Sequence, residues 1–143
     1  MVKSPQLIFN SSLRKDYNDV EQTRMLLTSV LREHKIDYNF IPNIELSVYE
    51  TLVNIIEHTS IMFMDHPIII ECYITDTSVR ISISNYGEKF DLTGIEMPDI
   101  EEHFRFGKMR GLGIYFIRTL MDTVEYSYEN MINYITLIKE LKT

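Results

Sequence analysis

The sequence predicts an α/β (α+β) two-layer sandwich, in which helices cover one face of a mixed, mostly antiparallel β-sheet. Two amphipathic helical patterns follow a short first strand, two strand pairs are each closed by a tight turn, and a third helix lies between those pairs. Strands joined by hairpins run antiparallel, so this order excludes a doubly wound parallel sheet.

The first half of the chain is expected to hold one strand and two helices. Residues 6–10 form a short apolar strand pattern. Residues 16–34 carry apolar residues at helical spacing, and Asp16 and Asp19 favour the positive N-terminal end of that helix. The second helix starts after Pro42, because proline suits a first helical turn, and ends near residue 59 or 60.

The second half is expected to hold two hairpins around an irregular segment and a third helix. The first hairpin joins strands 67–75 and 78–85, and the closing hairpin joins strands 123–128 and 131–139 through residues 129–130. The segment 86–110 contains glycines, a proline and an acidic run, which is typical of a long binding loop or lid. A helix then begins at the Gly111-Leu-Gly113 stretch.

Length and composition limit the classes of function that the chain can have. The chain has 143 residues, of which 45% are hydrophobic and 24% charged, so residues 1–143 are expected to form one globular domain. A formal charge of −7 argues against a nucleic-acid partner. The N-terminal sequence lacks the apolar core of a signal peptide, no apolar run reaches a membrane span, and Cys72 is a single cysteine in a strand pattern. We therefore expect a cytoplasmic protein with a buried structural thiol and no membrane partner.

A polar stripe runs along the second predicted helix. Glu50, Asn54, Glu57 and His58 occupy positions i, i+4, i+7 and i+8, so they share one side of the helix. The carboxylate of Glu50 can accept a proton, and the amide oxygen of Asn54 can ligate Mg²⁺. Spacing alone favours a solvated helix face with an ordinary Glu–Asn pair, because such pairs are common on helices.

Two other stretches combine polar groups with glycine. Asn85 ends a strand just before Gly87, and an asparagine amide can recognise the edge of an adenine base. The same residues are also favoured in a simple strand-to-loop turn. Gly111 and Gly113 open a helix whose backbone amides can bind an anion, with Arg105 nearby in sequence, although a hinge into the helix explains the glycines too.

Taken together, three stretches resemble the sequence boxes of the Bergerat-fold (GHKL, histidine-kinase-like) ATPases. Residues 50–58 resemble the N box, residues 85–91 the adenine-binding box, and residues 111–122 the Gly-x-Gly box that follows the ATP lid, here about 86–110. The pattern is most similar to the bacterial anti-sigma factor serine/threonine kinases and covers nearly the whole chain. The resemblance implies a Bergerat-type sandwich for the fold.

The resemblance also implies a role for individual residues. Glu50 would be the general base that takes the proton from a serine hydroxyl of a partner protein, and Asn54 would hold Mg²⁺ at the phosphates of ATP. The other implied nucleotide contacts are Asn85 and Gly87 at the adenine with Thr136 nearby, Gly111 and Gly113 at the phosphates, and Arg105 at the γ-phosphate.

The implied function is that of an ATP-binding anti-sigma factor and serine-protein kinase that acts by partner switching. It would phosphorylate an anti-anti-sigma (STAS-type) protein, bind a sigma factor or another regulated target, and form a homodimer. The ATPase domain of a sensor histidine kinase is a weaker alternative, because no helix pair with a phospho-accepting histidine precedes the N box.

Two positions depart from the family pattern. Asn85 stands where the family has an aspartate, and Lys89 stands where it has a second glycine. An amide both donates and accepts hydrogen bonds, and it lacks the charge assistance of a carboxylate. The sequence therefore leaves open a second function, a non-catalytic or weakly nucleotide-binding regulator that retains the fold as a protein-binding module.

Overall fold

The computed structural model describes residues 4–94 and 113–141. The strands are β1 (Gln6–Leu13), β2 (Ile68–Ile74), β3 (Ser78–Tyr86), β4 (Thr123–Glu129) and β5 (Ile132–Glu140). The helices are α1 (Tyr17–Glu33), α2 (Ile41–His58) and α4 (Gly113–Leu120), with the 3₁₀ turns η1 (Ile61–Phe63) and η2 (Leu92–Gly94). This order of strands and helices agrees with the prediction.

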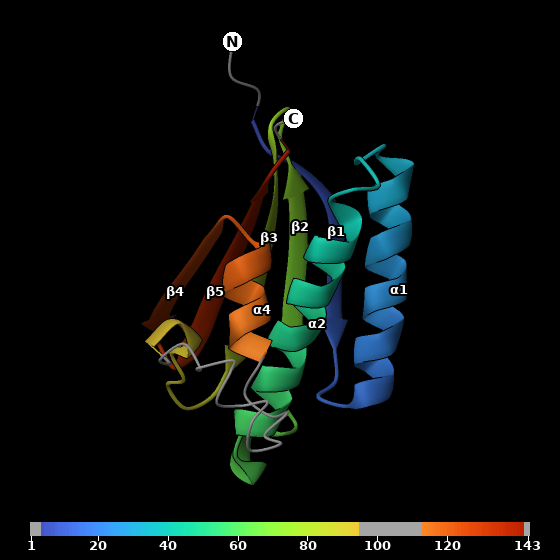
Figure 1. Cartoon of the computed structure of the whole chain (residues 1–143). Helices are drawn as coiled ribbons and strands as arrows, with labels where there is room; N and C mark the ends of the chain where they lie inside the picture. Colours follow the sequence, from blue (N-terminus) through green and yellow to red (C-terminus); the bar gives the residue numbers. More distant parts are fainter. Residues whose placement is uncertain (1–3, 95–112, 142–143) are drawn as a thin grey trace, which may run out of the picture.

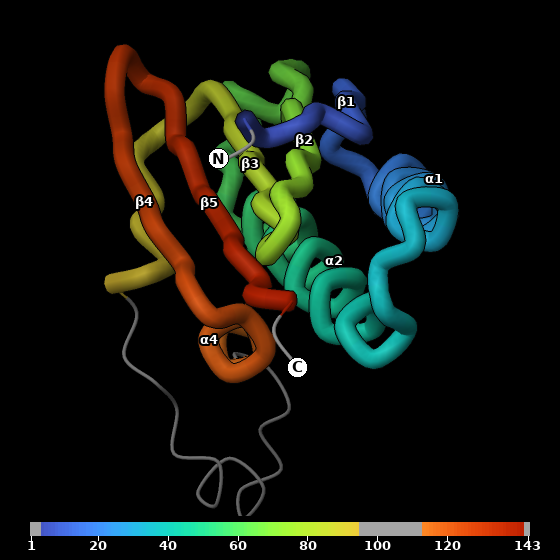
Figure 2. The backbone as a smooth tube through the Cα atoms, turned by 90° about the horizontal axis from the view of Figure 1, so that it is seen from above, coloured from blue at the N-terminus to red at the C-terminus, as the bar shows by residue number. Residues whose placement is uncertain are grey.

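The sheet has the strand order β1-β2-β3-β5-β4. The three helices of residues 4–94 and 113–141 lie against one face of it, with α1 over β1, α2 over the centre and α4 beside β5 (Figures 1 and 2). The predicted two-layer sandwich is confirmed. The expectation of a mixed sheet is wrong for the described strands, because each of the four strand pairs is antiparallel.

Helix α2 supplies the centre of the hydrophobic core. Its side chains Ile44, Val48 and Leu52 are completely buried, and Ile55 is 4% exposed. They recur at the three- to four-residue spacing of one helix face, as the sequence predicts, and join the core cluster that includes inward-facing residues of the central strands. The opposite flank of α2 is thereby left free to carry polar groups.

The closing hairpin turns one residue later than predicted. Asn130 and Met131 form its two-residue turn, and both have positive φ, of 53° and 63°. This backbone geometry matches the right-handed twist of the flanking strands, which is why two-residue hairpins favour it. The backbone carbonyl of Met131 accepts a hydrogen bond from the amide of Gly87 at 2.9 Å, so the turn also holds the end of β3 in place.

Cys72 lies in β2 with its side chain completely buried. Burial raises the pKa of its thiol to about 12. The expected buried structural thiol is confirmed.

Within residues 4–94 and 113–141, no helix has the length and apolar character needed to cross a membrane.

Helix α1 ends in a left-handed residue that is not a glycine. The amide of Ile36 donates to the carbonyl of Leu31 at 3.1 Å, and the amide of Lys35 donates to that of Arg32 at 3.0 Å. These two bonds form a Schellman motif, in which the left-handed position is usually glycine. Lys35 occupies that position with φ of 59°.

We expect Lys35→Gly to raise the free energy of unfolding by about 1 kcal/mol, because glycine adopts the left-handed conformation without the Cβ clash. Chemical denaturation of the two proteins measures the difference. Lys35→Ala is the matched control, since alanine removes the same side chain and keeps the clash. A gain of equal size in both variants would show that the lysine side chain, and not its backbone conformation, is responsible.

Candidate active site

The polar flank of α2 meets the start of α4. Glu50 and Asn54 are half-buried there, one helical turn apart. A Cβ atom placed on Gly113 would lie 2.7 Å from Oε2 of Glu50 and 3.2 Å from Nδ2 of Asn54. Only glycine lets the backbone of α4 approach this pair so closely. The structure thus brings together three residues that the sequence singled out separately.

The environment of Glu50 favours its neutral form. Burial is the largest cause of the raised pKa of this carboxyl group, and the negative charge of Glu57 adds to it. A carboxyl group whose pKa is shifted towards neutrality is a better proton acceptor when ionised than an ordinary surface glutamate. Of the four residues in the predicted stripe, Glu57 and His58 are exposed.

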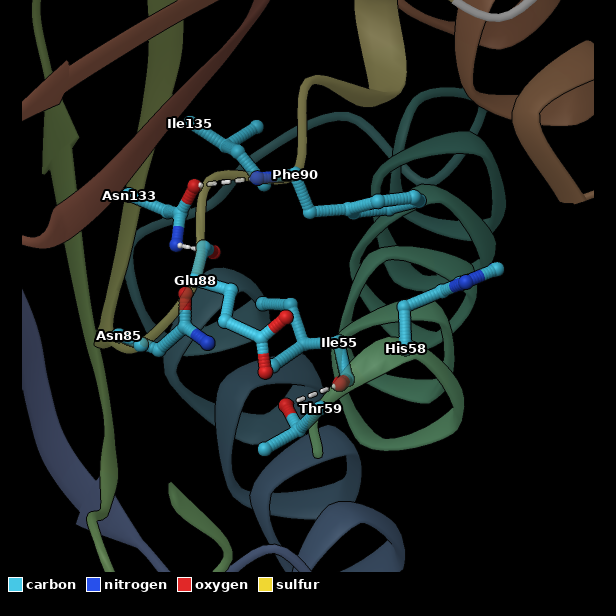
Figure 3. A pocket seen from close by; sticks show the side chains of 9 residues that line it. Ile55, His58, Thr59, Asn85, Glu88, Phe90, Asn133 and Ile135 are labelled. Carbon is cyan, nitrogen blue, oxygen red and sulfur yellow. Dashed lines mark hydrogen bonds between the residues drawn. The ribbon is translucent and has the colours of Figure 1, made fainter. Parts of the chain in front are cut away.

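A second set of polar groups surrounds a small cavity at the C-terminal end of α2 (Figure 3). Its volume is about 20 Å³, enough for about one water molecule. Asn85 lines this cavity with a side chain only 8% exposed. Within the described part of the chain, no hydrogen-bond partner satisfies its amide. The lining residues are Ile55, His58, Thr59, Asn85, Gly87, Glu88, Phe90, Asn133 and Ile135.

Asn133 fixes the turn that follows β3. Its Nδ2 donates to the backbone carbonyl of Glu88 at 2.8 Å, and its Oδ1 accepts from the backbone amide of Phe90 at 3.0 Å (Figure 3). The hydroxyl of Tyr126 donates to the same oxygen at 2.5 Å. Asn133 is 3% exposed. Because all of its partners are inside the protein, this buried amide acts as a clamp between the turn and strand β5.

Gly87 is held by its backbone. Besides its amide bond to Met131, its carbonyl accepts a hydrogen bond from the hydroxyl of Tyr128 at 2.9 Å. A Cβ on Gly87 would meet the ring of Phe63 at an ordinary 3.6 Å. Lys89 does not have positive φ, so the lysine at this position introduces no left-handed strain.

An aromatic pair closes one side of the cavity. The ring of His58 on α2 stacks on the ring of Phe90, with centroids 4.2 Å apart and planes 15° from parallel. A flat base would find the same kind of stacking partner in either ring. The cavity is far smaller than a purine, so a base can enter only if a side chain such as Phe90 turns aside.

The prediction that Thr136 lies beside Asn85 is wrong. In β5 the inward-facing positions are Asn133, Ile135 and Leu137, whereas Thr136 pairs with Ser82 on the open face of the sheet. It lines a different depression there. Asn133, which pairs directly with Asn85, occupies the place expected for Thr136 and was missed.

The remaining candidates lie outside the described residues. These are Arg105, Gly111 and the part of the expected lid beyond Gly94. The described start of the lid is anchored, because Leu92 is completely buried and the guanidinium of Arg118 on α4 donates to the carbonyl of Thr93. The fixed part of the lid therefore connects the cavity to α4.

The two ends of the site fit an adenine nucleotide with a divalent cation. The Glu50–Asn54 pair offers a proton acceptor and an amide oxygen beside the bare backbone of Gly113, which suits phosphates and Mg²⁺. The amide of Asn85, which has no hydrogen-bond partner among the described residues, offers base recognition at the C-terminal end of the same helix.

Comparison with known proteins agrees with this reading. The family described as "Histidine kinase-like ATPase domain" matches residues 13–139. Similar proteins named "Serine-protein kinase RsbW" include one from Listeria monocytogenes, 26% identical over 110 residues, covering 74% of this chain and 70% of the relative. One from Staphylococcus epidermidis is 28% identical over 128 residues, covering 86% and 80%.

Two solved structures share the fold. The structure of the RsbU and RsbW domains of a Mycobacterium tuberculosis protein has a TM-score of 0.69 at 18% identity, covering 97% of this chain and 33% of that one. This chain thus spans about a third of that protein. The structure of the SiaB–SiaC complex from Pseudomonas aeruginosa has a TM-score of 0.66 at 13% identity, covering 94% and 91%.

The raised pKa of Glu50 predicts a pH-dependent stability effect. The folded state holds the proton of this carboxyl group to higher pH than the unfolded state does, so stability falls as pH rises from the unfolded to the folded pKa. We expect Glu50→Gln to raise the melting temperature at about pH 7 and to have a smaller effect at about pH 4, where Glu50 is already protonated.

Thermal denaturation at the two pH values measures this effect. Glu129→Gln, at an exposed position of the closing hairpin, is the control for the loss of one negative charge. An equal effect of Glu50→Gln at both pH values would mean that Glu50 titrates as an ordinary surface carboxylate.

Proposed function

Because the chain belongs to the histidine kinase-like ATPase domain family, we propose that it is a cytoplasmic, ATP-dependent serine/threonine-protein kinase of the anti-sigma type. The observation that carries the proposal is the cluster of Glu50, Asn54 and Gly113 at the junction of α2 and α4. In this cluster a carboxyl group, a carboxamide and the start of α4 lie within a few ångströms of one another.

In this proposal each residue has a separate task. Bound ATP would supply the phosphoryl group to the serine oxygen and leave as ADP, and Mg²⁺ would neutralise charge on its phosphates. Asn54 would ligate the cation through its amide oxygen, and the start of α4 at Gly113 would bind phosphate through backbone amides, together with Gly111 and Arg105. Glu50 would take the proton from the hydroxyl of the acceptor serine.

The base would bind beside the C-terminal end of α2. Asn85 would present its amide to the adenine edge, and the backbone of Gly87 would form part of the wall. His58 and Phe90 would offer stacking surfaces once the aromatic pair opens. The clamp by Asn133 holds this wall in position before the nucleotide arrives, which reduces the ordering needed on binding.

The proposed protein substrate is an anti-anti-sigma protein of the STAS type, with a sigma factor or another regulated target as the alternative partner. The serine-protein kinase names of the relatives support the reaction, and the protein complex in which one structural neighbour was solved supports a protein partner. We further propose that the chain acts as a homodimer.

One observation favours the second candidate function, a protein-binding module without turnover. The cavity beside Asn85 is about 20 Å³, and the His58–Phe90 stack closes one side of it. If these side chains never separate, the site excludes nucleotide and only the protein surfaces act. Transfer of phosphate from Mg·ATP to a partner separates the two functions directly.

The first test is phosphoryl transfer from Mg·ATP to STAS-domain proteins encoded in the same genome, with the phosphoserine identified by mass spectrometry. We expect transfer by the wild-type chain and a loss of at least about a hundredfold in Glu50→Ala, since general base catalysis typically contributes that much. Nucleotide binding should survive in the variant. Undiminished transfer by Glu50→Ala would remove Glu50 from the reaction.

Gly113→Ala tests the close approach of α4 to the catalytic pair. The added Cβ would push against Oε2 of Glu50, the mobile end of a long side chain, so the fold should be retained while the carboxylate is displaced. We expect the melting temperature to change little and transfer to fall by about tenfold or more, because small misplacements of catalytic groups are costly.

Gly94→Ala is the matched control, since its Cβ would make only ordinary contact with Asp91. Equal transfer by Gly113→Ala and the wild type would show that the spacing between α4 and Glu50 does not matter.

A further inference from the structure

In the proposed site, the amide of Asn85 alone cannot distinguish adenine from guanine. This amide carries an acceptor oxygen at one end and a donor nitrogen at the other, and turning the group by half a rotation exchanges them. One orientation matches adenine, which offers an amino donor beside a ring-nitrogen acceptor. The reversed orientation matches guanine, which offers a carbonyl acceptor beside a ring N–H donor. Selection between the two bases therefore needs a second group of fixed character.

The other polar side chains around the cavity are already occupied. Both ends of the Asn133 amide are bonded within the protein. The hydroxyl of Thr59 donates to the carbonyl of Ile55 at 2.5 Å. The carboxylate of Glu88 also lines the cavity, and within the described residues it has neither a hydrogen bond nor an ion pair.

The backbone of Glu88 is fixed on both sides. Its carbonyl is bonded to Asn133, and hydrogen bonds to β4 and β5 hold Gly87 before it and Phe90 two residues after it. Figure 3 shows the side chains of Asn85 and Glu88 both extending from this end of β3 towards Ile55 of α2 and Thr59, which follows that helix. An ionised carboxylate can only accept hydrogen bonds.

We propose that Glu88 is the residue that makes this site select adenine. Its carboxylate accepts from the exocyclic amino group of the base, and it repels the exocyclic carbonyl that guanine presents at the same position. Because the carboxylate of Glu88 can only accept hydrogen bonds, it determines which of its two orientations the Asn85 amide takes towards the base. The inference rests on the proposed nucleotide-binding function and concerns the choice of base within it.

The test is calorimetric titration of Mg·ATP and Mg·GTP into the wild-type chain and into Glu88→Gln. We expect the wild type to prefer ATP, and the variant to lose about tenfold of the ATP-to-GTP affinity ratio, because one charge-assisted contact is replaced by a group that can also donate. Glu129→Gln removes an equal charge from an exposed position outside the cavity, and its ratio should match the wild type.

A second variant tests the mechanism of selection. The double variant Asn85→Asp/Glu88→Gln again has a carboxylate in the cavity, now at position 85 and not at position 88. We expect this double variant to recover part of the preference for ATP. Because Glu88 is exposed and its backbone bonds remain, the variants should fold, which thermal denaturation checks.

Each other outcome has a distinct meaning. An unchanged affinity ratio in Glu88→Gln, with ATP still bound, overturns the role of Glu88 and leaves the kinase proposal intact. Equal tightening of both nucleotides identifies Glu88 as an obstruction and also overturns the role. Absence of binding of either nucleotide to the wild type overturns the nucleotide site itself, and the selection of adenine with it.

Discussion

The burial of one face of α2 against the sheet is the constraint on which the site depends. Ile44, Val48 and Leu52 are completely buried, and each such side chain stabilises the fold by about 1.5–3 kcal/mol. Half-burying the carboxyl group of Glu50 on the flank of the same helix works against this gain. Because the helix is fixed in both position and rotation, its polar flank is held at a defined place beside α4 and beside the end of β3.

The two ends of the site are built by different means. At the Glu50 end, the absence of a side chain on Gly113 allows two helices to approach closely. At the Asn85 end, hydrogen bonds from Asn133, Tyr126 and Tyr128 hold an irregular turn against the β4–β5 hairpin. In both places the backbone geometry is set by interactions that do not involve the side chains of Glu50 and Asn85, neither of which makes a hydrogen bond within the described residues.

Local patterns were sufficient to predict most of the fold. The helical period of the α2 sequence and the tight turns of both hairpins depend on neighbouring residues, so the element order and the sandwich followed from the sequence. The alternation of side chains along β5 was also sufficient to correct the prediction for Thr136. Ile135 and Leu137 face inwards, so Thr136 faces outwards and Asn133 faces inwards. A polar residue at an inward position was the available signal for Asn133.

Other features of the site and the sheet could not be predicted from residues that are neighbours in the sequence. The His58–Phe90 stack and the approach of Gly113 to Glu50 join segments that lie far apart in the chain. The parallel component expected in the sheet is absent from the described strands, since pairing direction between β1 and β2 is decided by how α1 and α2 return the chain across the sheet. Resemblance to a family indicated which residues meet, and the structure supplied how they are held.

The central claim is that one nucleotide spans the flank of α2 from the Asn85 cavity to Gly113. Backbone amide chemical shifts recorded by NMR during titration with Mg·ATP test it most directly. The account predicts saturable shifts at Asn54, Asn85, Glu88 and Gly113, and none on the open face of the sheet around Thr136. Shifts confined to that open face, or no shifts at millimolar nucleotide, would contradict it.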